Sequence, residues 1–538
     1  MLTPMRWTDH FSYILVFIIC AYLFVGGFYA LYTPAWQAPD EPAHYNYVRY
    51  LAENNRFPVL HYGDYPHAYL EQIKSAKFPP DMSVEPIRYE FWQPPLYYVL
   101  AMPIYRLFDG ALLPLRLLSL ALGAGVLVTA YAIVLTVRPG DTALALGTVA
   151  FVAFVPMHLA MMASVNNDAL AELLLAVVML RLIQWTRESP GKGGRASPRF
   201  SFLVVTGLLL GLGLVTKATV YVALPLALIA LLMSERRPAR LAWQALALFA
   251  PALVLAAPWY VRNVAVYGWP DLLGTRNHAA VVVGQLRTAD YLADVGWAAY
   301  LKNFLTDSFH SFWGQFGWMA VPMHRWLYLA LGLLSALAVV GWVLALWRGW
   351  KAGRLEGWKA GRLEDWKIGR LEDWEIGKQE YRTQSSQPTN LPIYQSTNLP
   401  TYHSSTPALL AGLWLIFTIL MYLYYNLSLV QFQGRYLFPA LIPIGLLATL
   451  GLREILSRRW VWVAMSLCGV TAAAVGVSSA LGGGLDKWGL LIACGATMAL
   501  GVRYWLPARL DGWVLAIPLA GLAVLSVYSL FAFIVPFL

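Results

Sequence analysis

Charged residues are scarce in this sequence. Asp, Glu, Lys and Arg together make up 13% of the 538 residues, whereas hydrophobic residues make up 59%. A chain of this length with so little charge cannot form a hydrated surface. The composition therefore excludes a soluble fold and indicates a protein that lies in lipid. Cysteine is scarce as well. Cys20, Cys468 and Cys494 all lie in apolar segments, with neither the spacing of a zinc site nor that of a disulfide framework.

Long apolar runs dominate the rest of the sequence. They recur from Phe11 to Leu538, and each has about 17 to 25 residues, enough to cross a hydrocarbon core about 30 Å thick as a helix. We therefore predict an all-α fold, a polytopic bundle of about thirteen transmembrane helices. The predicted spans begin at Phe11, Pro114, Asp141, Asp168, Ser201, Thr219, Leu241, Trp326, Pro407, Tyr436, Trp460, Lys487 and Gly512.

The basic residues between the spans predict how the chain is oriented. Short cytoplasmic loops retain Lys and Arg, and with the N-terminus inside, every basic cluster falls in a cytoplasmic loop. The same orientation places two long loops outside, residues 33–113 and 262–325. The net charge of +10 then follows from the topology and does not indicate a nucleic-acid partner. The clusters are Arg138; Arg187, Lys192, Arg195 and Arg199; Arg236, Arg237 and Arg240; and Arg453, Arg458 and Arg459.

An eight-residue repeat interrupts the series of spans. Tryptophan recurs every eight residues from Trp350 to Trp374, and the Ser, Thr, Gln and Pro-rich stretch that follows keeps the same period. Each repeat drifts by about 80° around a helix, so the tryptophans cannot form one buried stripe. We therefore predict that residues 348–406 are a disordered cytoplasmic insertion without a catalytic role; a partner-binding arm is the alternative. The insertion separates an N-terminal transmembrane module, residues 1–347, from C-terminal transmembrane helices, residues 407–538.

Two adjacent carboxylates follow the first predicted span. Asp40 and Glu41 lie in the sequence APDEPAHY, residues 38–45, just outside the membrane at a predicted helix start. Asp is a favoured N-cap residue and Pro42 suits a first helical turn, so helix capping alone would explain the pattern. The chemical alternative is general-base catalysis, since a carboxylate can take the proton of an attacking hydroxyl. The residues after Pro42 repeat with a helical period, which predicts an interfacial helix in this first outer loop.

Four further ionisable residues lie at the predicted outer ends of spans. Arg435 opens the span that begins QGRYLFP, where a guanidinium and helix-start amides suit a phosphate. Lys217 is unusual, because the positive-inside bias disfavours an outer lysine. Arg262 ends one span and Asp168 begins another, in the sequence SVNND. Structural alternatives exist here too: an arginine anchors or complements a helix end, and an aspartate caps a helix start.

The first outer loop closes with Glu90 and the sequence FWQPPLYY, residues 91–98. The carboxylates of this loop, the RY pair at Arg435 and the QPPLYY sequence together resemble the GT-C superfamily of membrane glycosyltransferases. That superfamily includes the protein O-mannosyltransferases and the lipid A aminoarabinose transferase. The resemblance covers most of the chain outside the repeat insertion.

The resemblance implies roles for particular residues. In GT-C enzymes an Asp or Glu of the first outer loop is the catalytic base, which gives this role to Asp40 or Glu41, with Asp40 favoured. Members often have His where Gln93 stands, so no metal ligand is expected there. No cofactor is predicted, although the pattern leaves a divalent metal open. The substrate-binding candidates are Arg435 near the carrier phosphate, Lys217, Arg262, Asp168, Tyr45 and Gln93.

The resemblance also implies a reaction. A sugar would move, with inversion, from a polyprenyl-phosphate donor to a hydroxyl of a glycan, lipid or protein acceptor. The site would face outward from a bacterial plasma membrane, with membrane lipid as the other partner. A transporter or flippase for a lipid-linked glycan is the alternative. Transporters place charge or broken helices near the bilayer midplane, whereas the spans predicted here are nearly free of central charge, which favours the enzyme.

Overall fold

The computed structural model describes residues 10–187, 199–377, 406–481, 486–507 and 510–538. Within these ranges nearly all regular structure is helical, and two short strands pair as one antiparallel hairpin. Nine of the described helices are long and apolar enough to cross a membrane, or ten spans if one bent helix pair is counted as a span. The predicted all-α polytopic fold is therefore confirmed, whereas the count of thirteen spans is not.

The helices follow the apolar runs of the sequence. The first half of the chain forms α1 (His10–Tyr32), α2 (Glu41–Asn54), α3 (His67–Ser75), α4 (Leu96–Leu107), α5 (Leu112–Val137), α6 (Thr142–Phe154), α7 (Pro156–Met162), α8 (Asp168–Arg187), α9 (Arg199–Leu214), η1 (Ala218–Val222), α10 (Ala223–Ser234) and α11 (Pro238–Tyr267). The rest forms α12 (Thr275–Val281), α13 (Thr288–Trp313), β1 (Gln315–Phe316), β2 (Val321–Pro322), α14 (Arg325–Gly377), α15 (Thr406–Ser428), η2 (Gly434–Ala440), α16 (Leu441–Ile455), α17 (Val461–Leu481), α18 (Lys487–Trp505), α19 (Asp511–Val514), α20 (Ala516–Ser529), η4 (Leu530–Ile534) and α21 (Val535–Phe537).

Some predicted spans are shorter or bent. The segments predicted at Ser201 and Thr219 form apolar helices of fewer than 18 residues, and α6 and α7 meet at an angle of 69°. The bend has a local cause. Pro156 has no N–H to donate to the carbonyl of Val152, and the Nδ1 of His158 donates to that carbonyl at 2.9 Å.

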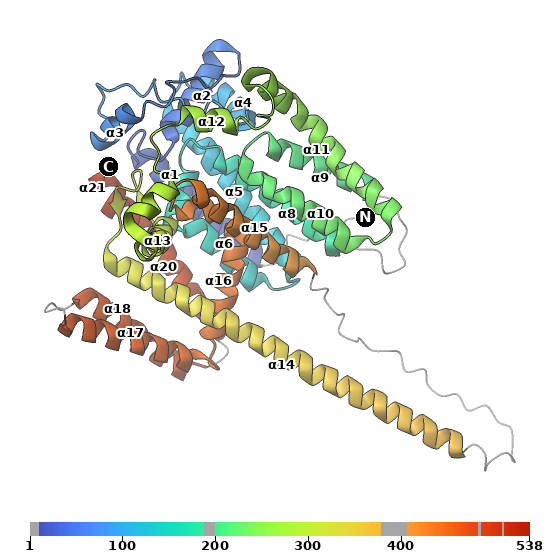
Figure 1. Ribbon diagram of the computed structural model, residues 1–538. Coiled ribbons are helices and arrows are strands. Elements are labelled where there is room, and N and C mark those ends of the chain that lie inside the picture. The colour runs from blue at the N-terminus through green and yellow to red at the C-terminus, as the bar shows by residue number, and fades with distance from the viewer. Residues whose placement is uncertain (1–9, 188–198, 378–405, 482–485, 508–509) are drawn as a thin grey trace.

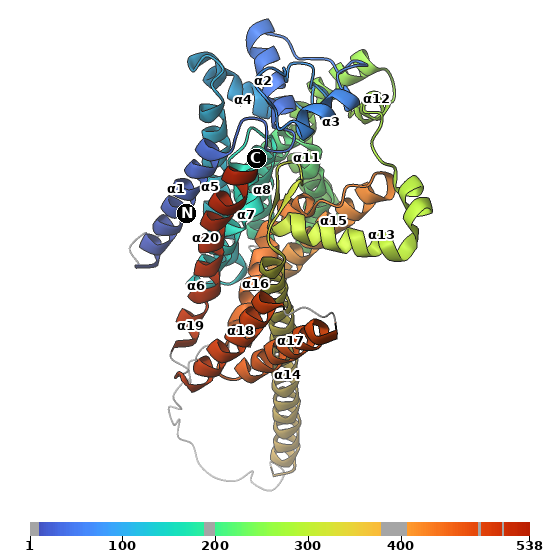
Figure 2. The ribbon, with the colours of Figure 1, turned by 90° about the vertical axis from the view of Figure 1, so that its left-hand side faces the viewer.

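The long helices pack as a bundle (Figures 1 and 2). α5 lies against α6 and α8, α9 against α11, and α14 against α16. Gly341 and Gly451 bring the last pair together, because a Cβ added at either glycine would overlap the backbone of the other helix. Such close approach through small residues is a common way to join helices in lipid, where apolar contact alone gives little advantage.

The two long loops predicted outside share one end of the bundle, which we call the loop end. Figure 2 shows α2, α3 and α12 gathered there. Hydrogen bonds join the two loops: Asn277 donates to the carbonyl of Leu60 at 3.0 Å, and the indole N–H of Trp318 donates to the carbonyl of Trp36 at 3.0 Å. The two loops therefore pack against each other, and most residues of α2, which belongs to the first of them, are buried.

The eight-residue repeat continues α14 beyond its membrane span. The helix runs from Arg325 to Gly377, and its candidate membrane span, Arg325–Lys351, takes up about half of that length. The predicted disorder is therefore wrong for residues 350–377, while residues 378–405 lie outside the described ranges. The drift of the tryptophans excludes one buried stripe but not a helix, and the repeat is rich in helix-forming Lys, Leu, Arg and Glu. Figure 1 shows this part of α14 leading away from the bundle, opposite the loop end.

Candidate active site

Asp40 lies in the link between α1 and α2, and its side chain does not cap α2. Its backbone is in the left-handed region, with φ at 66°, and no side-chain hydrogen bond reaches the helix start. One carboxylate oxygen instead accepts from the Tyr89 hydroxyl at 2.7 Å, and the other accepts from the Arg435 guanidinium at 2.8 Å. A left-handed conformation is costly for a non-glycine residue, so capping does not account for Asp40.

Arg435 reaches Asp40 from η2, 395 positions further along the chain. Its guanidinium also donates to Gln433 Oε1 at 2.7 Å and lies 3.7 Å from the sulfur of Met161. Gly434 lets η2 lie directly against α13, because a Cβ there would overlap the backbone of α13. These contacts fix the guanidinium beside the carboxylate, and the arginine side chain is 9% exposed.

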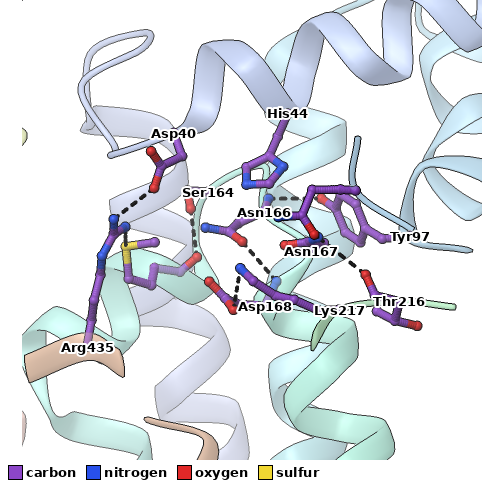
Figure 3. Close-up of polar contacts among 12 residues, drawn as sticks. Asp40, His44, Tyr97, Ser164, Asn166, Asn167, Asp168, Thr216, Lys217 and Arg435 are labelled. Atoms are coloured by element: carbon purple, nitrogen blue, oxygen red, sulfur yellow. Dashed lines mark hydrogen bonds and ion pairs between the residues drawn. The ribbon is translucent and has the colours of Figure 1, made fainter. Parts of the chain in front are cut away.

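A second ion pair joins two other predicted residues. Asp168 is the first residue of α8, and its carboxylate lies 2.7 Å from the Nζ of Lys217, which precedes η1. The backbone N–H of Asp168 donates to Asn166 Oδ1 at 2.8 Å, which fixes the start of the helix. Figure 3 shows this pair near the Asp40–Arg435 pair. Four residues that were singled out from distant parts of the sequence therefore form one cluster.

His44 lies next to both ion pairs and was not predicted as a site residue. It is affected by the charges of all four residues of the two pairs. Figure 3 shows its ring pointing from α2 toward them. Burial, followed by the charge of Lys217, lowers the pKa of His44 to about 3. The imidazole is therefore neutral at physiological pH, and its Nδ1 lies 2.8 Å from a tyrosine hydroxyl of α4.

Glu90 is a second residue that was not predicted as a site residue. It is 9% exposed, and its Oε2 has no hydrogen-bond partner among the described residues. Burial, followed by the charge of Asp40, raises the pKa of Glu90 to about 7. Asp40 behaves in the opposite way. Burial would raise its pKa, but the charge of Arg435 and the hydrogen bonds from Tyr89 and Arg435 outweigh burial and hold it below the usual value.

Glu41 is part of a different, closed ion pair. Its carboxylate is fully buried and accepts from Arg116 Nε and Nη2 at 2.8 and 2.6 Å. The backbone N–H groups of Trp36 and Val165 complete its coordination, at 3.1 Å each. Arg116 also donates to the carbonyls of Ala30, Thr33 and Pro34. The pair therefore joins α1, α2 and α5, and both oxygens of Glu41 already have partners.

The remaining predicted residues divide between the cluster and the loops around it. Gln93 lies beside the cluster, since its Oε1 accepts at 3.4 Å from Asn167, the residue before Asp168. The Tyr45 hydroxyl donates to a backbone carbonyl at 2.8 Å, and Arg262 donates to the carbonyl of Pro58. Neither Tyr45 nor Arg262 contacts the two ion pairs within the described ranges. No group of three or more His, Cys, Asp or Glu side chains that could hold a metal occurs in those ranges either.

This fold is the architecture of the GT-C membrane glycosyltransferases. The chain is similar to crystal structures of ArnT from Cupriavidus metallidurans bound to undecaprenyl phosphate and in the apo state, each with a TM-score of 0.51. Sequence identities are 16% and 17%, and the similarity covers 96% of this chain and 76% of ArnT. An oligosaccharyltransferase from Archaeoglobus fulgidus gives a TM-score of 0.45 at 11% identity, over 95% of this chain and 56% of that protein.

The chain belongs to the family described as predicted membrane protein, DUF2142. The family model matches residues 88–356, half of the chain. No curated protein matches the sequence. The matched region contains Glu90, Asp168 and Lys217, whereas Asp40 and Arg435 lie on either side of it. The protein is therefore a multi-pass membrane protein whose candidate site draws on segments within and beyond the family region.

Proposed function

We propose that this protein is an inverting glycosyltransferase that moves a sugar from a polyprenyl-phosphate donor to a hydroxyl acceptor. The observation that carries the proposal is the ion pair between Asp40 and Arg435. It brings a carboxylate of the first outer loop together with a guanidinium at the start of a late span, 2.8 Å apart. The Asp40 side chain is 25% exposed, so this pair is open to a ligand, unlike the closed pair of Glu41.

The charges suit transfer from a lipid phosphate. The acceptor oxygen bonds to the anomeric carbon, the bond from that carbon to the phosphate oxygen breaks, and its electron pair leaves with the carrier phosphate. Arg435 and Lys217 stabilise the charge that develops on the phosphate. Asp40 takes the acceptor proton. A single base and a single displacement give inversion.

The Asp40–Arg435 pair must open in part for this chemistry. A carboxylate that is held by a guanidinium is a weak base, and Arg435 holds the pKa of Asp40 below its usual value. The donor phosphate competes for the same guanidinium, since Arg binds phosphate through its fork of N–H groups. Donor binding therefore draws Arg435 toward the phosphate and makes Asp40 more basic just when the acceptor needs it.

The donor class has structural support from a relative. ArnT, which shares the fold, was crystallised with undecaprenyl phosphate. We extend that ligand class to this chain because cations lie at span ends, the depth at which a lipid phosphate sits. Glycan, lipid and protein acceptors all supply the hydroxyl that the reaction needs.

Donor cleavage separates this function from transport. Purified protein in liposomes that contain undecaprenyl-phosphate hexoses, with a membrane lipid extract as acceptor, is expected to release undecaprenyl phosphate, detected by mass spectrometry. A flippase would move the intact donor between leaflets and release no carrier. Intact donor after prolonged incubation would therefore contradict the proposal.

We also propose that the loop end faces outward from a bacterial plasma membrane, because that orientation leaves the short basic loops inside. In a cysteine-free background, Tyr62→Cys, at a position that is 84% exposed, is expected to react with an impermeant thiol reagent on intact cells. Arg236→Cys, in a short basic loop, is expected to react only after permeabilisation. The reverse labelling would place the site inside.

A further inference from the structure

Two buried oxygen atoms beside the ion pairs have no hydrogen-bond partner. They are Oε2 of Glu90 and Oδ1 of Asn167, and each lacks a partner among the described residues. Glu90 is 9% exposed and Asn167 is 0% exposed. A buried acceptor without a partner destabilises the fold, because it has lost its hydrogen bonds to water. Two such atoms in one cluster therefore require an explanation.

The orientation of the Asn167 amide follows from its neighbours. Its nitrogen lies 3.4 Å from Gln93 Oε1 and 3.4 Å from the backbone carbonyl of Thr216. A backbone carbonyl only accepts hydrogen bonds, so turning the Asn167 amide over would place its oxygen against the oxygen of Thr216. Oδ1 is therefore the free end of Asn167.

Gln93 connects the two unpaired acceptors. It accepts from Asn167, and a hydrogen bond from its side chain acts on the Glu90 carboxyl. The charges of Asp40, Lys217 and Asp168 act on Glu90, so this group of side chains lies close to both ion pairs. Asn167 precedes Asp168 in the chain, and Glu90 follows Tyr89, whose hydroxyl donates to Asp40.

We propose that Glu90, Gln93 and Asn167 form a subsite that binds the hydroxyl groups of the transferred sugar. The subsite presents two acceptors that lack donors, and sugar hydroxyls are donors. It adjoins Asp40 and Lys217, the groups that act on the anomeric carbon and on the phosphate in the proposed reaction. The inference rests on the proposed function and adds to it the groups that recognise the sugar.

The subsite predicts selectivity among donors. A site built to hydrogen-bond a hydroxyl rejects an analogue that lacks it, because the protein acceptor is then left unpaired. Wild-type protein is expected to use at least one monodeoxy analogue of its preferred undecaprenyl-phosphate hexose at least about tenfold less well in kcat/KM. Glu90→Met and Asn167→Leu, which remove the acceptors at similar volume, are expected to lose most of that discrimination.

Stability gives a second readout that does not depend on turnover. Without donor, Glu90→Met is expected to melt at a higher temperature than the wild-type protein, because it removes a buried carboxyl with an unpaired oxygen. When the parent donor is added, the melting temperature of the wild-type protein is expected to rise by more than that of the variant. A merely structural Glu90 would give the opposite result, a lower melting temperature for Glu90→Met without donor. Glu85→Gln, an exposed glutamate of the same loop, is the control.

The experiment separates the subsite from the proposed function. If the wild-type protein releases carrier but the two variants keep its discrimination, the subsite is overturned and the function stands. If no donor is cleaved, the function is overturned. In that case a donor-induced rise in melting temperature that Glu90→Met loses supports the subsite, and no rise in the wild-type protein overturns it as well.

Discussion

The ion pairs around the site differ in how much of their side chains is exposed: two are partly exposed, or open, and one is buried, or closed. In the Asp168–Lys217 pair the side chains are 27% and 17% exposed, and Asp40 is 25% exposed in its pair with Arg435. The Glu41–Arg116 pair is almost wholly buried, with exposures of 0% and 4%. A partly exposed pair can exchange one partner for a ligand at modest cost. Breaking a buried pair leaves an uncompensated charge, so the closed pair is suited to structure.

Asp40→Asn tests the base directly. Asparagine tolerates the left-handed backbone of this position and keeps an oxygen that can accept from Tyr89. The fold should therefore survive while the base is lost. We expect turnover to fall on the order of a hundredfold or more, with a much smaller change in melting temperature. Turnover is measured as released undecaprenyl phosphate, and near-normal turnover would exclude Asp40 as the base.

Glu90 predicts how stability depends on pH. Its pKa is raised to about 7 by burial and by Asp40; the charges of Lys217 and Asp168 also act on it. Because the folded pKa lies above the unfolded value of about 4.3, this group's stabilising contribution is complete below that value and is lost as pH rises toward 7. The melting temperature of the wild-type protein is expected to fall relative to Glu90→Met across this window. Parallel curves from pH 4 to 8 would show that Glu90 does not titrate near neutrality.

Part of the site could be predicted from the sequence and part could not. Asp40, Arg435, Asp168 and Lys217 stand out because a charge at the end of an apolar span needs a reason. Their pairing could not be predicted, because contact between positions 395 residues apart depends on how the bundle closes. Glu90 carries no spacing or motif, and only its burial distinguishes it from the exposed glutamates of the same loop.

The elements around the site depend on the closed pair. Arg116 in α5 binds Glu41 at the start of α2, one carbonyl in the last turn of α1 and two carbonyls just after that helix. Glu41→Ala leaves Arg116 buried without its carboxylate, so it is expected to cost roughly 3–5 kcal/mol of unfolding free energy. Thermal unfolding in detergent measures this loss. Normal stability together with lost turnover would instead assign the role of base to Glu41.

The end of α14 provides a test of the insertion. The described helix continues past Lys351 but leads away from the loop end, where the charged cluster lies (Figure 1). Deleting Lys351 to Ser404 is therefore expected to preserve carrier release and melting temperature. Loss of turnover in a well-folded deletion variant would give the repeat a functional role and favour the partner-binding arm.

The positions of most helices could be predicted from the apolar runs of the sequence, but the lengths of the helices could not. An apolar run must become a helix in lipid, because no other open structure satisfies its backbone there. The same argument cannot show that the run after Asp141 breaks at Pro156, since the break depends on His158 satisfying the carbonyl that the proline leaves free. The repeat was misjudged for a related reason: its period excludes a buried stripe but does not exclude a helix.

The whole molecule brings distant segments to one end of the bundle. The link before α2, the starts of α8 and η2, and the turn before η1 each supply one charge of the two open pairs. Figure 3 shows these charges with His44 in one small region. Under the proposed function, this grouping of two partly exposed pairs at the loop end serves chemistry on a lipid headgroup rather than passage across the bilayer.

Donor kinetics of Arg435 variants test this account most directly. Purified wild-type, Arg435→Lys and Arg435→Ala proteins are given undecaprenyl-phosphate hexoses, and released undecaprenyl phosphate is measured by mass spectrometry. Arg276→Ala, at an exposed arginine of α12, is the matched control. The account predicts release by the wild-type protein and the control. It predicts a loss of about tenfold or more in kcat/KM for Arg435→Ala, and partial recovery in Arg435→Lys because a point charge lacks the two-pronged geometry. Equal release by wild-type and Arg435→Ala proteins of equal stability, or no release by the wild-type protein, would contradict it.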